Sequence, residues 1–148
     1  MFQHDDASSP RWIKIRSIDH DFEEEGFTLT LIISNIQLKC CSHGDDTIKV
    51  YSLSGELLQT YDAHGNGDAG QLDGPYISDD DDDGSVLIAD CGNNRLQVMS
   101  EQGEFSVLQL KLKPPVSRPR SAVLFNNQLY VASARTVFSQ DTIYKYSC

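Results

Sequence analysis

A run of five aspartates, Asp79 to Asp83, is the stretch whose residue types best suggest metal chemistry. Carboxylates at every second position, followed by Gly84 and by Asp90, satisfy most of the pattern of an EF-hand calcium loop. An EF-hand also needs flanking helices, whereas this run joins two predicted strands. We therefore favour a solvated loop and expect no resident metal. In the alternative, the calcium ligands would include Asp79, Asp81 and Asp83.

Basic side chains gather in one later stretch of the chain, where prolines separate them. Loops on a rigid scaffold are where binding residues usually lie. A cluster of this kind could recognise RNA or an acidic peptide, but we favour an extended, proline-rich connection with solvated charges. The candidate binding residues are Lys111, Lys113, Arg118, Arg120, Tyr130 and Arg135.

Patterns typical of catalysis are absent from the sequence. It has no nucleophile elbow, no glycine loop for phosphate and no paired histidines for a metal. Its four cysteines form no C-x-x-C pair, so neither a zinc site nor a disulfide framework is indicated. We expect Cys41 and Cys91 to pack as small hydrophobic residues. The sequence therefore predicts no enzyme, no catalytic residue and no cofactor.

The charge balance limits the choice of partner. The chain has 22 acidic and 12 basic side chains, and its formal net charge is −10. Such a surface repels phosphate backbones, which argues against strong binding of RNA. The longest apolar run, around Leu29 to Ile33, is too short to span a bilayer, and the first residues do not resemble a secretion signal. We expect a cytoplasmic protein with a protein partner and no membrane partner.

An internal repeat indicates the elements that would position these residues. Residues 44–57 match residues 92–105 without a gap, at an offset of 48 residues. A looser third copy begins at Pro119, which lies 44 residues after Pro75. Within each copy, short aliphatic or alternating segments are separated by turns rich in Gly and Asn. Four short strands in roughly 40–50 residues are typical of a propeller blade.

One segment, residues 84–99, resembles the NHL repeat, and Asn94, Arg95 and Leu96 stand where the family has its Asn-His-Leu triplet. The glycine-rich segment 65–72 resembles the inter-blade linker of the same family. The resemblance covers roughly residues 37–146. It implies an all-β fold, a partial β-propeller of about three NHL-type four-stranded blades. The expected blades are residues 37–74, 75–118 and 119–148, preceded by a divergent segment or degenerate blade over residues 1–36.

The flanking copies depart from the repeat at several positions. Ser42 and Ser133 replace Asp90, and the third copy lacks the turn rich in Asn. In the central copy we expect Asp90 and Arg95 to pair across a hairpin, in a structural role.

About three blades are fewer than the roughly four to eight that close a propeller. We therefore expect a fragment of a larger protein, or self-association that completes the ring. The chain ends where the fourth strand of its last blade would follow. Many propellers supply that strand from the other end of the ring, so we expect a natural C-terminus.

The repeats also resemble the C-terminal propellers of tripartite-motif proteins. The resemblance implies a non-catalytic protein-interaction scaffold that recruits substrates for ubiquitination. The zinc-binding modules that carry ligase activity would lie outside this chain. One alternative is an RNA-binding propeller of the same family, which the basic stretch favours and the net charge disfavours. Another is a lyase-type NHL enzyme, which the lack of matching histidines disfavours.

Overall fold

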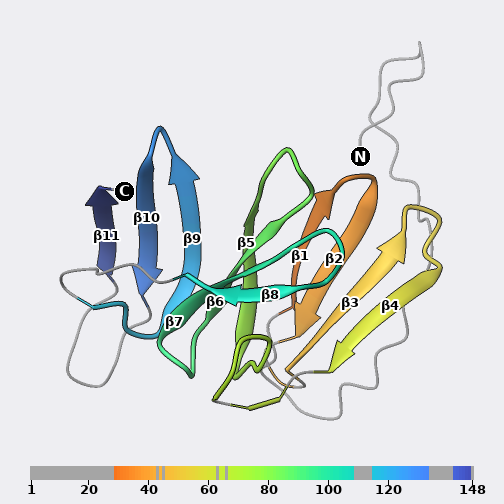
Figure 1. Cartoon of the computed structure of the whole chain (residues 1–148), viewed down its shortest axis with the longest axis horizontal. Coiled ribbons are helices and arrows are strands. Elements are labelled where there is room, and N and C mark those ends of the chain that lie inside the picture. Colours follow the sequence, from red (N-terminus) through yellow and green to blue (C-terminus); the bar gives the residue numbers. More distant parts are fainter. Residues whose placement is uncertain are drawn as a thin grey trace, which may run out of the picture.

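The computed structural model describes residues 29–42, 44, 46–62, 64–65, 67–108, 115–133 and 142–147, and these form three antiparallel β-sheets (Figure 1). Each sheet is built from strands that follow one another in the chain. Within a sheet, strands that are consecutive in the sequence pair with each other. Within the described part of the chain, no helix is long and apolar enough to cross a lipid bilayer.

Each sheet corresponds to one blade of a propeller. Blade 1 consists of β1 (Leu29–Ser34), β2 (Gln37–Ser42), β3 (Thr47–Ser52) and β4 (Leu57–Asp62). Blade 2 consists of β5 (Pro75–Asp80), β6 (Val86–Asp90), β7 (Arg95–Met99) and β8 (Phe105–Val107). Blade 3 consists of β9 (Pro119–Phe125), β10 (Gln128–Ser133) and β11 (Thr142–Ser147).

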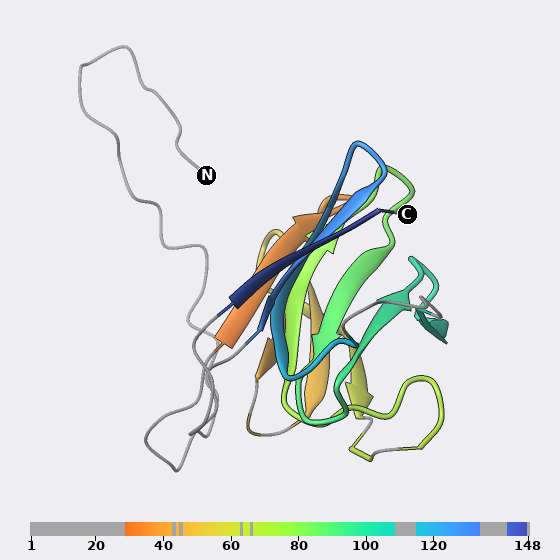
Figure 2. The ribbon, with the colours of Figure 1, turned by 90° about the vertical axis from the view of Figure 1, so that its left-hand side faces the viewer.

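The first strands of consecutive blades lie next to each other, because β5 contacts both β1 and β9. In Figure 1, β5 lies between β9 and β1. Figure 2 shows the same sheets from the side. This arrangement is a partial β-propeller, so the fold class predicted from the sequence is confirmed. The first blade begins at Leu29, within the segment 1–36 that the sequence sets apart, and residues 1–28 lie outside the described residues.

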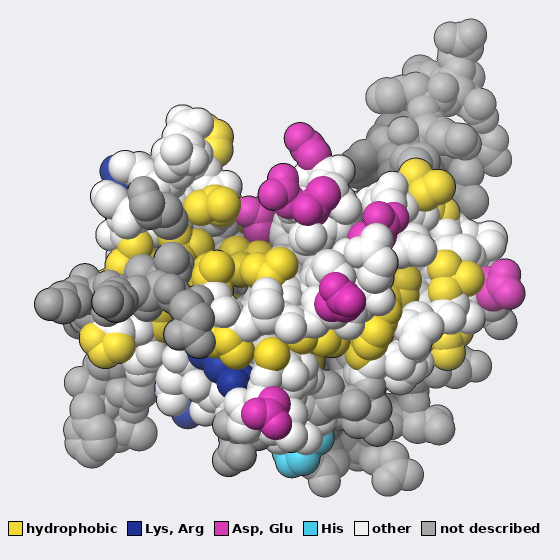
Figure 3. Space-filling view, viewed as in Figure 1, with side chains coloured by type: hydrophobic (Ala, Val, Ile, Leu, Met, Phe, Trp, Pro, Cys, Tyr) yellow, Lys and Arg dark blue, Asp and Glu magenta, His cyan; other side chains and the backbone are white. Residues whose placement is uncertain are grey.

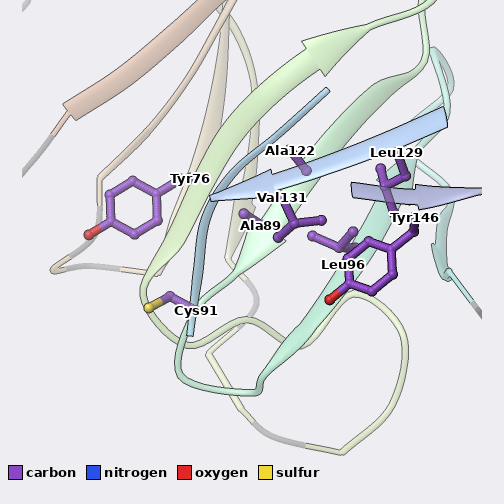
Figure 4. Packing of buried hydrophobic residues seen from close by; sticks show 8 residues of the cluster. All are labelled: Tyr76, Ala89, Cys91, Leu96, Ala122, Leu129, Val131 and Tyr146. Atoms are coloured by element: carbon purple, nitrogen blue, oxygen red, sulfur yellow. The ribbon is translucent and has the colours of Figure 1, made fainter. Parts of the chain in front are cut away.

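Blade 2 packs against a neighbour on each face, because successive side chains in a strand point to opposite sides. Tyr76 and Ile77 of β5 show this directly, since they belong to two different clusters of buried residues. The cluster between blades 1 and 2 contains Cys41, Ile48, Leu72, Ile77, Val86, Ile88 and Met99. The cluster between blades 2 and 3 contains Tyr76, Ala89, Cys91, Leu96, Ala122, Leu129, Val131 and Tyr146 (Figure 4).

A buried carboxylate holds the linker between blades 1 and 2. The side chain of Asp90, which is fully buried, accepts hydrogen bonds from Arg95 Nε at 2.8 Å and from Gln97 Nε2 at 2.9 Å. It also accepts from the amide of Asp73 at 2.8 Å and from the side chain of Asn93 at 2.9 Å. The predicted pairing of Asp90 with Arg95 is therefore confirmed. The same Arg95 donates to three carbonyl groups of the linker, those of Gly67, Asp68 and Gln71.

A glycine allows the turn between β7 and β8 of blade 2 to contact blade 1. Gly103 has a φ of 83°, and a side chain at this position would overlap the Tyr61 ring of β4. Tyr61 in turn packs edge-on against Phe105, with ring centroids 5.9 Å apart. The outer strands of blades 1 and 2 are thus in contact at this turn.

Removing the Asp90 carboxylate should strongly destabilise the fold. In Asp90→Ala, the donors of Asp73, Asn93, Arg95 and Gln97 lose their shared acceptor, and we expect the free energy of unfolding to fall by about 3–5 kcal/mol. Urea denaturation followed by tryptophan and tyrosine fluorescence measures this loss. The control is Asp82→Ala, an exposed aspartate of the β5–β6 hairpin, with an expected change within about 0.5 kcal/mol. Equal effects of the two substitutions would contradict the role assigned to Asp90.

Candidate functional site

A cleft lies between blades 2 and 3, at the end of the sheets where the β5–β6 and β9–β10 hairpins lie. It encloses a cavity of about 350 Å³. Figure 3 shows hydrophobic surface here, next to a group of acidic side chains. The cleft is lined by Asp79, Asp80, Asp81, Ser85, Val86, Leu87, Val98, Leu108, Leu124 and Leu129.

The walls of the cleft are aliphatic and come from two separate sheets. Leu87 and Val98 are register partners on β6 and β7 and so share one face of blade 2. Leu124 and Leu129 are register partners on β9 and β10 and share the facing side of blade 3. Leu129 is 1% exposed and forms the floor, whereas Leu124 is 55% exposed at the mouth. A concave site with apolar walls and an accessible edge is typical of ligand binding.

Three aspartates, Asp79, Asp80 and Asp81, line the cleft, and we call them the acidic rim. One oxygen of Asp79 accepts a hydrogen bond from the amide of Leu124 at 3.0 Å, so this side chain bridges the two blades. Its other oxygen accepts from the amide of Asp80, also at 3.0 Å. Negative charge beside a wall of low dielectric constant concentrates the negative potential at the mouth.

A β-bulge explains why Asp79 faces the cleft. Strict alternation from Tyr76 would place Ser78 on the blade 3 side and Asp79 on the blade 1 side. The register between β5 and β6 shifts between Ile77 and Asp79, so that Asp79 pairs with Leu87 of the cleft wall. Bulges re-aim side chains in this way. The sequence gives no sign of the shift.

A lysine of blade 1 binds the β5–β6 hairpin, which carries the acidic rim. The ammonium group of Lys39, whose side chain is 1% exposed, donates a hydrogen bond to the carbonyl of Gly84 at 2.7 Å. Burial lowers the pKa of Lys39, and the nearby carboxylates of Glu101, Asp80 and Asp83 partly oppose this effect. Lys39 therefore anchors the β5–β6 hairpin to blade 1.

In the described part of the chain, no three His, Cys, Asp or Glu side chains converge as metal ligands, and this includes the acidic run. Asp81 accepts a hydrogen bond from the amide of Asp82 at 2.8 Å. Asp83 accepts from the amide of Ser85 at 2.8 Å, and hydrogen bonds from Ser85 lower the pKa of Asp83. The three calcium candidates thus bind backbone amides of their own hairpin and of β9.

The predicted basic site is only partly described, because Lys111, Lys113 and Arg135 lie outside the described residues. Arg118 and Arg120 lie at the start of β9, at the end of the blade opposite the cleft. The guanidinium group of Arg120 is 6.0 Å from the centre of the Tyr76 ring. Tyr130 faces the other side of blade 3, where the ammonium group of Lys145 lies 5.8 Å from its ring centre. The structure brings together the two arginines but not Tyr130.

The described cysteines and histidine lie away from the cleft mouth. Cys41 and Cys91 are each 1% exposed, which confirms their packing in the core, and burial raises the pKa of the Cys91 thiol. His64 Nδ1 lies 2.5 Å from a carboxylate oxygen of Asp46, at the opposite end of the blades. The other oxygen of Asp46 accepts a hydrogen bond from the amide of Gly74 at 2.6 Å, so this pair connects blade 1 to the linker.

Sequence reasoning missed the aliphatic walls of the cleft. One signal was present, since Val123, Leu124 and Phe125 are three consecutive apolar residues in a predicted strand. Alternation directs Leu124 to one face and its two neighbours to the other, so apolar surface must remain exposed unless both faces are covered. In the structure all three side chains are at least 42% exposed.

Comparisons with known proteins identify no family. No family model matches the chain, and no curated protein matches it. Among solved structures, the chain is similar to a streptogramin B lyase, at 17% identity and a TM-score of 0.47, over 82% of this chain and 45% of that one. It is also similar to virginiamycin B lyase from Staphylococcus aureus, at 16% identity and a TM-score of 0.47, over 83% and 46% of the two chains. A catalytically inactive variant of that lyase with Quinupristin matches equally well. The chain thus spans less than half the length of these structures.

These matches correct one expectation from the sequence. The lack of catalytic motifs predicted that the chain is not an enzyme, but the matched structures are enzymes, so that exclusion is wrong. The physical reason is that activity depends on a few side chains placed on a fold, and a search for known motifs tests only known placements. At this identity the likeness concerns the fold, and it does not single out tripartite-motif proteins.

The burial of Lys39 predicts a pH dependence of stability. The folded-state pKa of Lys39 is below its ordinary value of 10.5, so the unfolded chain binds more protons just below pH 10.5. Stability from this group therefore increases as the pH rises towards that value. We expect the difference in unfolding free energy between the wild type and Lys39→Met to shift in favour of the wild type from about pH 8 to about pH 10. Parallel urea titrations measure it, and a difference that is constant with pH would contradict the lowered pKa.

Proposed function

We propose that the chain is a protein-binding part of a β-propeller and that the cleft between blades 2 and 3 is its binding site. The observation that carries the proposal is the cavity of about 350 Å³ with aliphatic walls and a partly exposed leucine, Leu124, at its mouth. Sites of about 300–1,000 Å³ are typical of bound ligands. This cavity is at the small end of that range, which suits one or two side chains of a polypeptide segment.

The way the cleft is built supports binding of a partner without large rearrangement. Its two walls are fixed by the buried cluster below, which includes Ala89, Ala122 and Val131, and by the hydrogen bond from Leu124 to Asp79 above. A preformed site loses little conformational entropy when a partner binds. Its mouth lies at two hairpin ends, where propellers and other rigid scaffolds present variable side chains.

The alternative of RNA binding has less support from the described residues. The carboxylates of the acidic rim repel phosphate at the cleft. At the other end of blade 3, the Tyr76 ring near Arg120 is 5% exposed, so it offers little surface on which a base could stack. Protein binding is the function that this geometry favours.

The resemblance of residues 84–99 to the NHL repeat suggests a more specific role. Under it, the blades would form the substrate-recruiting end of a ubiquitin ligase of the tripartite-motif type, and the partner would be a protein to be ubiquitinated. Residues 37–148, which contain the blades, would serve as the recruiting domain in the cytoplasm.

A charge placed at the cleft mouth should weaken partner binding. We expect Leu124→Glu to weaken at least tenfold the binding of peptides selected on the wild-type chain from a displayed random peptide library, because it puts a carboxylate against the apolar wall. The matched control is Leu58→Glu, which changes a leucine of similar exposure, 47%, on β4 of blade 1. Fluorescence polarisation measures the affinities, and circular dichroism checks that both variants fold.

Two outcomes of these experiments would contradict the proposal. Peptides that bind Leu124→Glu as tightly as the wild type would show that the cleft is not the binding site. A selection that enriches no peptide on the wild-type chain would contradict protein binding of this kind altogether.

A further inference from the structure

We infer that the cleft between blades 2 and 3 selects an extended peptide segment that carries an aliphatic residue and, two positions later, a lysine or arginine. This inference rests on the proposed function and adds the chemistry of the partner. It is carried by the arrangement of charge around the apolar cavity.

Among the described residues that line the cleft, all the charged ones are acidic. Its described lining includes Asp79, Asp80 and Asp81, and none of the described lining residues is basic. Among the described residues, the Lys39 ammonium group interacts electrostatically with the rim residue Asp80, but it lies on the blade 1 side and is bound to the carbonyl of Gly84. That charge is buried, so it cannot serve a ligand in the cleft. An occupant that brings its own positive charge is therefore favoured.

The apolar and charged groups are separated in depth. The floor is formed by Leu129, which is 1% exposed, while Asp80 and Asp81 are exposed at the mouth. An occupant must consequently bury an aliphatic group and keep a cation near the solvent. Lysine and arginine suit the second position, because their aliphatic stems can lie along apolar surface while the charged group stays in water.

The spacing of the two groups follows from strand geometry. In an extended segment, side chains at positions i and i+2 point to the same side and lie about 6–7 Å apart along the chain. An aliphatic residue at position i can then enter the cavity while the cation at position i+2 reaches the acidic rim. Neighbouring positions i and i+1 point to opposite sides, so they cannot do this together.

The orientation of Asp79 leaves the outer two carboxylates for the partner. Both oxygens of Asp79 accept backbone hydrogen bonds, from Leu124 and from Asp80. Asp80 and Asp81 are exposed, and both residues line the cleft. We therefore assign Asp80 and Asp81 as the residues that determine the preference for a basic side chain.

The test uses three short synthetic peptides that differ only at positions i and i+2: Leu and Lys, Leu and Gln, and Gly and Lys. We expect the first to bind best in fluorescence polarisation at low salt. Changing both rim residues, Asp80→Asn with Asp81→Asn, should weaken its binding about three- to tenfold and leave the second peptide unaffected. The loss should shrink at high salt, because screening weakens exposed ion pairs.

The control variant changes the net charge by the same amount as the rim variant, but at positions away from the cleft. Glu56→Gln with Asp68→Asn removes the same charge from exposed positions in blade 1 and in the linker. This double variant should bind all three peptides as the wild type does. If it weakens the Leu and Lys peptide as much as the rim variant does, binding depends on net charge and the inference is overturned.

Two failures are distinguishable. If Leu124→Glu abolishes peptide binding but neither the lysine nor the rim carboxylates matter, the cleft binds proteins and only the inferred partner chemistry is wrong. If Leu124→Glu leaves binding of the Leu and Lys peptide unchanged, the cleft is not the site, and the proposed function fails together with the inference.

Discussion

The buried carboxylate of Asp90 is the interaction on which the rest of the structure depends. It receives hydrogen bonds from two side chains of β7, Arg95 and Gln97, which in turn bind the linker that leads into blade 2. A buried charge is tolerated only when such partners are present. Blades 1 and 3 carry Ser42 and Ser133 at the matching position, and the hydroxyl of Ser133 finds no partner among the described residues. The connection that leads into blade 2 is therefore held by several hydrogen bonds.

The cleft is a consequence of how the inner strands meet. The inner edge of each sheet presents backbone amides that need partners. Thr30 of blade 1 accepts a hydrogen bond from the amide of Ile77 at 2.9 Å, and Asp79 of blade 2 accepts one from the amide of Leu124. At the Asp90 end of the second interface, the small side chains of Ala89 and Ala122 allow close packing. At the hairpin end, leucines line the gap that the Asp79 contact spans.

Much of the fold could be predicted from the sequence, because the repeat at residues 44–57 and 92–105 corresponds to the β3 and β7 hairpins. The site could not, since it depends on a bulge after Ile77 that leaves no mark in residue type. Nearness in sequence suggested that Tyr130 lies with Arg118 and Arg120. Side chains alternate between the two faces of β10, however, so Tyr130 points to the other face of blade 3. Lys39 shows the same limit, since a lysine in an alternating strand is expected at the surface and here is 1% exposed.

Because the cleft has one wall on each blade, occupancy and blade packing are thermodynamically linked. An occupant that contacts Leu87 on blade 2 and Leu124 on blade 3 adds apolar contacts to the interface between them. Anything that binds only the packed arrangement stabilises it by mass action. Blade 3 would gain from this linkage, because its other face exposes Phe125 and Ile143 by 62% and 75%. Binding at the cleft would therefore also reinforce a blade that packs against a single neighbour within the described part of the chain.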